Sequence, residues 1–399
     1  MTGRDGIKGK NRRGMAVLGG AVGAFAAAAA MATGSAVTAA PAKADFEDLL
    51  DPIIQPILTS LTDSLAGFDP TAAADLTSWT DSFLSSLNAL DVTAALPSAA
   101  EPAAALTTIS GGDVIPLSVQ EGTEPTVDVS VDGSAPELTL VDTGSSGLLV
   151  PLNDLSLTQL FDLGFPTGIN AVSFSGGIVA FYLVYNDATV GFGDGAVTTT
   201  NTPVDVAFFS FPTSFSAGSP LDFQQFLADN DSPGGILGIG DSGETGPGTS
   251  PFEAAGVSGV TVDAPQGELV VGSNAGTPID TLTGAAIPTS NLTETVTTST
   301  GALVGTGSVS DDVDSGGVFG TIPSSLVGTS GELPVGDVVK VFDGQTLLYS
   351  YTVENDGVFE SPTVVSGTAI DSGFAPFFQE PIFISYGGAN ADGAITFDK

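Results

Sequence analysis

The residues that most clearly suggest chemistry are four aspartates, each followed by a hydroxyl residue and a glycine. They are Asp142-Thr143-Gly144, Asp241-Ser242-Gly243, Asp314-Ser315-Gly316 and Asp371-Ser372-Gly373. Such triplets are also common in turns, because Asp and Ser bond back to the chain and Gly adopts left-handed angles. The residues around each triplet must therefore decide which of them carries function.

Histidine and cysteine are absent from the 399 residues. The sequence therefore lacks a Ser-His-Asp or Cys-His nucleophile, a disulfide, and a zinc site built on imidazole or thiolate. Acid–base chemistry must come from carboxylates, hydroxyls or water. This restriction gives the aspartate triplets more weight than their number alone.

The charge is strongly one-sided, with 46 acidic residues against 8 basic ones and a formal net charge of −38. Six of the basic residues lie in the first 43 positions, so removal of the chain up to Ala44 leaves two basic and 45 acidic groups, a charge of −43. Such a surface repels phosphate backbones, which argues against a nucleic-acid partner.

Residues 1–44 at the amino end are predicted to form an export signal. Basic residues between Lys8 and Arg13 precede an uncharged stretch over 14–41, and Ala42-Lys43-Ala44 forms a small-x-small cleavage site. The uncharged stretch is also long enough to span a membrane, which is the alternative. We expect an exported protein, secreted or associated with the cell envelope, and the choice between the Sec and twin-arginine routes stays open.

The remainder divides into a helical part and a strand-rich part. Residues 45–95 predict a helical hairpin, which packs, docks a partner or serves as a propeptide, and 96–106 is an Ala/Pro linker. From 107 onward, short strands alternate with Gly, Asp and Ser turns, for example over 137–140, 178–182 and 268–271. This part is predicted to be all-β.

Two triplets have a specific context. Residues 138–141 form a strand that leads to Asp142, and Ser145-Ser146-Gly147-Leu148-Leu149-Val150-Pro151 follows. This stretch resembles the first active-site loop of pepsin-like aspartic proteases. Residues 313–320, followed by Ile322-Pro323-Ser324-Ser325-Leu326, are similar to their second loop. The segment 235–240 resembles the strand that supports the first loop, and Asp371 begins the matching segment of the second lobe; it is the runner-up for the second catalytic acid.

With its export signal, the chain most resembles the mycobacterial pepsin-fold proteases associated with the PE family. The resemblance implies an all-β, bilobal fold with lobes at 107–275 and 276–399. It implies an aspartic endopeptidase that acts on protein or peptide substrates without a cofactor, and we expect a monomer. Other cell-surface proteins are further candidate partners.

The resemblance also assigns site residues. Asp142 and Asp314 would form the catalytic pair, which activates a water and polarises the scissile carbonyl. The substrate-binding region would contain Thr143, Gly144, Ser145, Phe174, Ser315 and Gly316. Within it, the two hydroxyls after the aspartates would tie the loops together, the glycines would allow close approach, and Ser145 would donate to Asp142. Phe174 would hold its ring over the cleft as part of a flap, with Tyr182 and Tyr185 as alternatives.

One position departs from the family pattern. Gly317 stands where pepsin-like enzymes usually have Ser or Thr, so the carboxylate of Asp314 would lack a donor and its pKa would rise. We expect a less acidic pH optimum or weaker activity, and Gly317→Ser should move the acid limb of the rate profile downward.

Three other readings compete with the protease. A catalytically silent pepsin fold would serve as a binding or surface protein, and a protease with one triplet would dimerise through its Asp142 loops. Calcium is a further possibility, with ligands from 311, 312 and 314 or from 229 and 231, although neither group has the full loop spacing.

Overall fold

A computed structural model describes Thr77 and most of the chain from 109 to 399. Outside the described residues are the other positions up to 108 and the short stretches 176, 194, 196, 213–219, 241–246, 285–291, 329–330, 368 and 388–392. The predicted export signal, helical hairpin, linker and Asp241 triplet therefore lie outside the described residues. The account below concerns the unit that contains residues 106–399.

The first lobe is built on an eight-stranded sheet. Its strand order is β2-β3-β4-β9-β5-β8-β7-β6, with a further pairing of β3 to β7. The bounds are β2 Ser118–Gln120, β3 Glu124–Val131, β4 Glu137–Asp142, β5 Ser146–Pro151, β6 Gly168–Phe174, β7 Ile178–Phe192, β8 Val197–Pro212 and β9 Gly235–Ile239. The strand β9 lies between β4 and β5, and all five of its residues are buried.

The second lobe contains a five-stranded sheet in the order β17-β16-β13-β14-β19 and a two-stranded sheet of β15 and β18. The bounds are β13 Leu292–Thr297, β14 Leu303–Asp312, β15 Thr321–Pro323, β16 Val338–Asp343, β17 Thr346–Thr352, β18 Thr363–Val365 and β19 Ala369–Asp371. In β13 every second residue is buried, which is the pattern of a strand with one face in the core. This alternation places Glu294 inside, between Leu292 and Val296.

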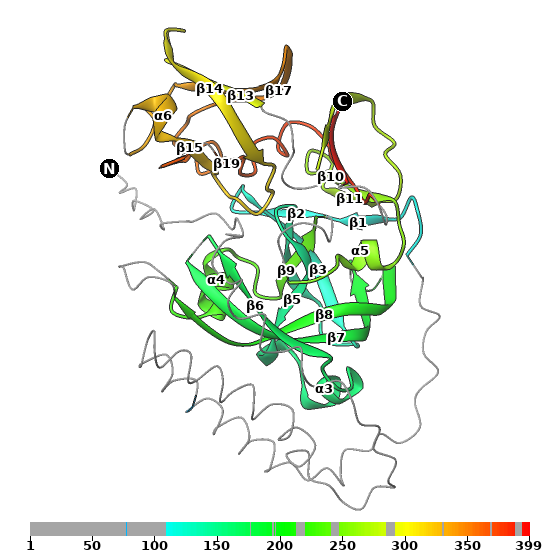
Figure 1. Ribbon diagram of the computed structural model, residues 1–399. Helices are drawn as coiled ribbons and strands as arrows, with labels where there is room; N and C mark the ends of the chain where they lie inside the picture. Colours follow the sequence, from blue (N-terminus) through cyan, green and yellow to red (C-terminus); the bar gives the residue numbers. More distant parts are fainter. Residues whose placement is uncertain are drawn as a thin grey trace, which may run out of the picture. The chain divides into compact units, whose positions relative to one another are not determined.

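A six-stranded sheet joins the two halves of the chain in the order β1-β11-β10-β20-β21-β12. The bounds are β1 Val114–Pro116, β10 Gly259–Asp263, β11 Glu268–Val271, β12 Pro278–Thr283, β20 Ile382–Ser385 and β21 Ala394–Asp398. The strands before 275 and after 276 thus hydrogen-bond within one sheet, for example Val260 opposite Ile384. The labels of Figure 1 place β10, β11 and β1 together in this region.

Helices are short in the described part of the chain: η3 Leu152–Asp154, α3 Leu157–Asp162, α4 Phe223–Asp229, α5 Pro251–Ala254 and α6 Ser324–Val327. The helix α4 begins at Asp222, whose side chain accepts a bond from the backbone of Gln225, and it buries Phe223, Phe226 and Leu227. None of the described helices is long and apolar enough to cross a membrane. The strands predicted over 137–140, 178–182 and 268–271 are confirmed, and so is the all-β class.

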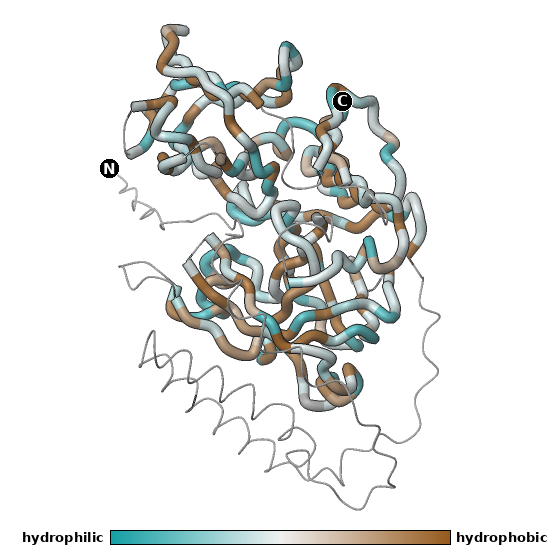
Figure 2. The backbone as a smooth tube through the Cα atoms, viewed as in Figure 1, coloured by the Kyte–Doolittle hydropathy of each residue, from teal (hydrophilic) through white to brown (hydrophobic). Residues whose placement is uncertain are grey.

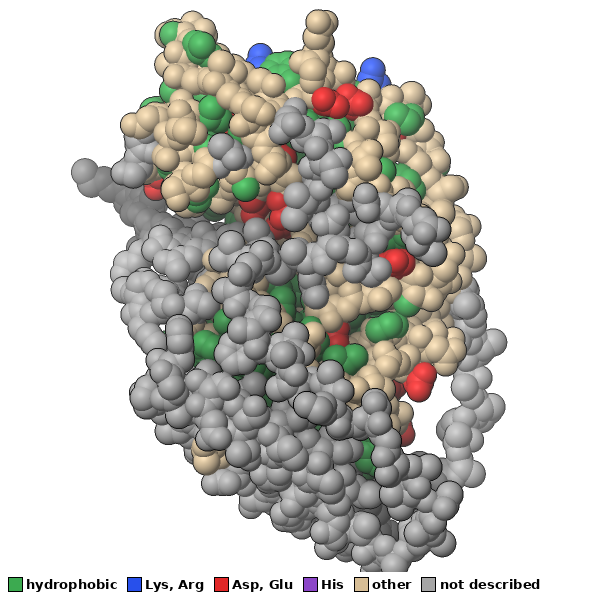
Figure 3. Space-filling view, viewed as in Figure 1, with side chains coloured by type: hydrophobic (Ala, Val, Ile, Leu, Met, Phe, Trp, Pro, Cys, Tyr) green, Lys and Arg blue, Asp and Glu red, His purple; other side chains and the backbone are tan. Residues whose placement is uncertain are grey.

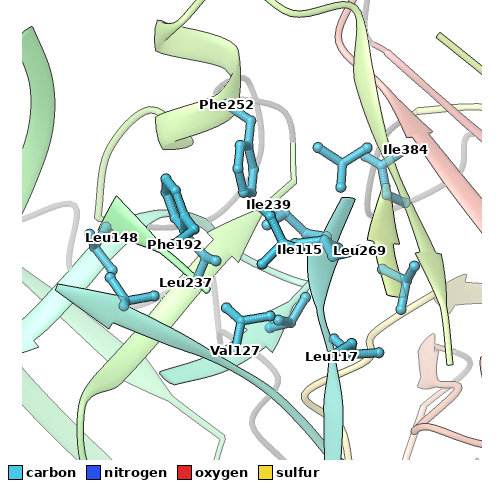
Figure 4. Packing of buried hydrophobic residues seen from close by; sticks show 14 of the residues in the cluster. Ile115, Leu117, Val127, Leu148, Phe192, Leu237, Ile239, Phe252, Leu269 and Ile384 are labelled. Atoms are coloured by element: carbon cyan, nitrogen blue, oxygen red, sulfur yellow. The ribbon is translucent and has the colours of Figure 1, made fainter. Parts of the chain in front are cut away.

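The core is formed by residues on the inner faces of these sheets. Figure 2 shows brown, hydrophobic segments along the strands and teal segments in the turns. In the close view of Figure 4, Ile115, Leu237, Ile239 and Leu269 pack with Phe192 and Phe252, whose ring centroids are 4.9 Å apart. Residues from the first sheet and from the six-stranded sheet therefore share one cluster.

Acidic side chains lie on the surface of the described part as the composition predicts. On the face drawn in Figure 3, red side chains occur at several places, while blue ones appear only near the upper edge. Of the positions after 44, only Lys340 and Lys399 are basic. The negative charge keeps such a protein soluble.

Candidate active site

The first loop, which contains Asp142, follows from β4 and packs against β9. These two strands are parallel, with Leu140 opposite Ile236 and Asp142 opposite Gly238. A side chain at Gly238 would come within 2.8 Å of backbone atoms of Ser145 and Ser146. Only glycine lets β9 approach the loop this closely. The contact supports Asp142 at the buried end of β4.

The second loop is built in the same way. The strand β14 runs parallel to β19, with Asp312 opposite Asp371, and Asp314 follows two residues after the end of β14. The backbone N–H of Asp314 donates to the hydroxyl of Ser372 at 3.1 Å. Each lobe therefore presents one aspartate from a strand that a parallel neighbour supports.

Reciprocal hydrogen bonds tie the two loops together. The hydroxyl of Thr143 donates to the carbonyl of Val313 and that of Ser315 to the carbonyl of Val141, both at 2.6 Å. The same hydroxyls accept from the opposite backbones, Thr143 N–H to Ser315 Oγ at 3.0 Å and Ser315 N–H to Thr143 Oγ1 at 2.8 Å. These are the hydroxyl–backbone bonds expected from the sequence.

The two carboxyls lie against each other's loops. A Cβ added to Gly144 would be 2.5 Å from Cγ of Asp314, and one added to Gly316 would be 3.1 Å from Cγ of Asp142. Both aspartates have no exposed surface. The structure thus brings Asp142 and Asp314 together, with the glycine of each loop packed against the carboxyl of the other loop.

The hydrogen bonding of the pair is unequal. Asp142 accepts from the backbone N–H of Gly144 at 2.9 Å and from the hydroxyl of Ser145 at 2.6 Å. Asp314 accepts from the backbone N–H of Gly316 at 2.7 Å, and no backbone N–H or hydroxyl in the described part donates to its Oδ2. Since donors stabilise the charged form, Asp142 is the better placed of the two to carry the negative charge.

Electrostatics reinforces this difference. Burial raises the pKa of Asp142, while its contacts with Asp314, Ser145 and Gly144 lower that pKa in part. Burial raises the pKa of Asp314 well above its usual range, and repulsion from Asp142 and Asp371 raises it further. Because each carboxyl shifts the pKa of the other, their titrations are coupled and belong to the pair rather than to either residue.

Asp314 lacks a hydroxyl donor at Gly317, as expected, but a third carboxyl lies beside the second loop and changes the expected effect of Gly317→Ser. A Cβ added to Gly317 would overlap Oδ1 of Asp371 and would come within 2.8 Å of its Oδ2. The space of the missing serine is therefore filled, and Gly317→Ser alone would collide with this carboxyl rather than supply a donor. The sequence pattern did not reveal this contact because it joins two segments that are distant along the chain.

Phe174 also differs from the expectation. It ends β6 just before the turn at Gly177, so the predicted hairpin is present. Its ring, however, is 1% exposed and stacks on Phe223 and Phe226 of α4, at 6.0 and 5.5 Å between centroids. The ring lies in the core of the first lobe because two phenylalanines of α4 cover it. Tyr182 is likewise buried, and its hydroxyl donates to the carbonyl of Pro247.

Sequence reasoning missed a group of buried acids in the second lobe. Glu294 is 2% exposed and Asp311 is fully buried, and the hydroxyl of Tyr349 donates to Asp311 at 2.9 Å. Burial raises the pKa of Glu294 to about 8 and that of Asp311 well above its usual range. The only available signal was the period of β13, which places Glu294 inward. No group of three or more acidic, His or Cys side chains in the described part is arranged to hold a metal ion.

The fold and site together define a class: a two-lobed, all-β protein of the pepsin-like aspartic proteinase type, in which each lobe supplies one aspartate loop. The chain belongs to the family of PE-PGRS C-terminal aspartyl peptidase-like domains, whose model matches residues 113–394. This match confirms the family predicted from the two loops.

Known proteins with similar sequences agree with this assignment. The chain is 36% identical over 308 residues to PE cleavage protein A of Mycobacterium tuberculosis and 39% identical over 310 residues to PE cleavage protein A of Mycobacterium marinum. Each alignment covers 72% of this chain and 52% of the relative. The chain therefore spans about half the length of the curated relatives that it matches.

Among solved structures, an aspartic proteinase from Irpex lacteus is similar at 15% sequence identity and a TM-score of 0.46. The similarity covers 72% of this chain and 97% of that one.

Proposed function

We propose that this chain is an exported aspartic endopeptidase that hydrolyses peptide bonds of proteins at or outside the cell envelope. The observation that carries the proposal is the reciprocal bonding of Thr143 and Ser315, which brings Asp142 and Asp314 together in a buried site. Two buried carboxyls do not both ionise at low cost, so they share a proton, and the pairs of aspartic proteases are the standard example of this effect.

The unequal donors assign a role to each member of the pair. The carboxylate of Asp142 takes a proton from a water molecule, whose oxygen attacks the scissile carbonyl carbon. Asp314 gives its proton to the carbonyl oxygen, and the carbonyl carbon becomes a tetrahedral diol. The amide nitrogen then receives the proton held by Asp142, the C–N bond breaks, and a diol proton returns to Asp314. The pair ends each cycle with one proton, as it began.

Substrate class and location follow from other features. The relatives carry the name PE cleavage protein A, which supports PE-family proteins as substrates of this chain. Export is supported by the basic and apolar segment that ends at Ala42-Lys43-Ala44. The chemistry proposed uses only carboxyls and water, so no cofactor is needed, and one chain supplies both aspartates, so the enzyme is expected to work as a monomer.

The test compares cleavage of an unfolded protein by the wild type and by Asp142→Asn, Asp314→Asn and Asp187→Asn. We expect both variants of the pair to lose at least about a thousandfold in kcat/KM, because each removes a group that transfers a proton. Asp187 is exposed and serves as the matched control, with unchanged activity. Equal cleavage by wild type and Asp142→Asn would overturn the proposal.

A second candidate, a silent pepsin fold that binds proteins, is favoured by one observation. Asp314 lacks the hydroxyl donor that Ser145 gives to Asp142, since Gly317 occupies the matching position. A wild type that binds unfolded protein at acidic pH, yet never cleaves it, would support this alternative.

A further inference from the structure

Asp371 is a buried carboxyl that the proposed reaction does not use. It ends β19, is 6% exposed, and lies opposite Asp312 of β14. Its backbone N–H donates to Thr321 Oγ1 at 2.9 Å, and its Oδ1 accepts from the backbone N–H of Gly373 at 2.8 Å. The carboxyl is therefore held in one place beside the second loop.

Two consecutive glycines separate this carboxyl from the catalytic pair. A side chain at Gly316 would come within 3.2 Å of both Asp142 Cγ and Asp314 Oδ1, while one at Gly317 would overlap Asp371. Three carboxyls thus surround a two-residue stretch of backbone. In the first lobe the position that matches Gly317 holds Ser145, whose hydroxyl donates to Asp142.

We propose, on the basis of the proposed peptidase function, that Asp371 is a positioning residue for the Asp142/Asp314 pair: its carboxyl fills the space beside Gly317, and its negative charge, once formed, holds the shared proton on the pair. A hydroxyl in this place would stabilise the carboxylate of Asp314. A carboxylate in the same place does the opposite, because like charges repel.

The charge of Asp371 appears in a defined pH window. Burial raises its pKa to about 7, with a lowering contribution from the Gly373 N–H and a raising one from Asp142. Other acidic and phenolic groups face it or interact with it from the neighbouring elements: Asp142 of β4, Asp311 and Asp312 of β14, Asp314 of the second loop and Tyr351 of β17. As the pH rises through 7, Asp371 ionises and opposes the loss of the proton from Asp314.

The test measures kcat/KM against pH for the wild type, Asp371→Asn and Asp187→Asn, with an unfolded protein as substrate. Asparagine keeps the shape and the acceptor for Gly373 but carries no charge. We expect the basic limb of Asp371→Asn to move to lower pH by about one unit, with the acid limb unmoved. A basic limb that stays in place would overturn the inference. Complete loss of activity in a variant with the Tm of the wild type would also overturn it, because it would indicate that Asp371 is itself a catalytic acid.

A measurement without substrate separates this inference from the proposed function. Carboxyl 13C NMR of aspartate-labelled protein follows the titration of Asp314 in the wild type and in Asp371→Asn. A lower pKa of Asp314 in the variant supports the inference even when the wild type cleaves nothing, in which case only the proposed function fails. An unchanged pKa overturns the inference.

The space beside Gly317 gives an independent check. Gly317→Ser alone would collide with Asp371, and we expect at least a tenfold loss of kcat/KM. The double variant Gly317→Ser with Asp371→Ala removes the collision and should recover most of that loss. Equal damage in the single and double variants would contradict the placement of the Asp371 carboxyl.

Discussion

The two lobes support their aspartate loops with the same parallel strand pairing, but the supporting side chains are apolar in the first lobe and acidic in the second. In the first lobe, Leu140 lies two positions before Asp142 and pairs with Ile236 of β9. Both residues belong to an apolar cluster. In the second lobe, Asp312 lies two positions before Asp314 and pairs with Asp371 of β19. An apolar support in one lobe is thus replaced by an acidic one in the other.

This difference shows which part of the arrangement the loops require. Both lobes have the parallel strand pairing, and both loops take part in the reciprocal bonds of Thr143 and Ser315, although the supporting side chains are apolar in one lobe and acidic in the other. The acidic support instead changes the electrostatics, since the second lobe also buries Glu294 and Asp311. Backbone bonding sets the geometry of the pair, and the side chains beneath it set where its proton resides.

The strongest way to break the comparison is to give the first lobe the acid of the second, with Ile236→Asp. The new carboxyl would lie in the apolar cluster with Leu140 and Phe174, so the free energy of unfolding at pH 7 should fall by about 3 kcal/mol or more. Urea unfolding measures the change. The control Ile236→Val should cost only about 1 kcal/mol. If both substitutions cost the same, the two lobes tolerate buried acids equally and the contrast is wrong.

A smaller effect is expected from removing an acid of the second lobe, with Glu294→Gln. Because burial raises the pKa of Glu294 from 4.5 to about 8, the folded state binds more protons than the unfolded state between these values. The contribution of Glu294 to stability is therefore fully present below pH 4.5 and is lost as the pH rises through 8. Glutamine removes this loss, which is on the order of 2 kcal/mol at pH 6.

Thermal unfolding between pH 5 and 8 checks this prediction. The Tm of the wild type should fall more than that of Glu294→Gln, while the partly exposed Glu268→Gln should follow the wild type. Parallel curves for all three proteins would show that Glu294 is ionised in the folded state at no cost.

The smallest expected effect comes from making the first loop resemble the second, with Ser145→Ala. The hydroxyl of Ser145 lowers the pKa of Asp142, so its removal raises that pKa and moves the acid limb of kcat/KM to higher pH by about one unit. The buried Ser232→Ala is the matched control. An acid limb that does not move would mean that the two loops hold their carboxylates equally well without a hydroxyl.

The parts of the site that could be predicted from the sequence are formed by residues that are adjacent along the chain. Asp142 and Asp314 follow strand-like runs, and the hydroxyl and glycine after each one sit at fixed offsets. The bonds of Thr143 and Ser315 were expected from the resemblance of the two loops to those of pepsin-like proteases. The all-β class was equally accessible, because strand patterns and Gly-rich turns repeat along the chain.

The parts that could not be predicted depend on contacts between distant segments. The missing hydroxyl at Gly317 was predicted, but nothing near Gly317 in the sequence indicates that Asp371 fills the space. The position of Phe174 depends on α4, which begins about 50 residues later and covers the ring. Burial of Glu294 agrees with its strand period, yet an acid at an inward position contradicts the usual rule for strands.

The reciprocal bonds between the loops also determine when the site forms. Thr143 and Ser315 are 172 positions apart, so the carboxyl pair assembles only after the chain has closed a very long loop. Contacts of such separation form slowly and late in folding. A nascent chain therefore has no paired carboxyls, and the aspartate site stays unformed until both loops have folded against each other.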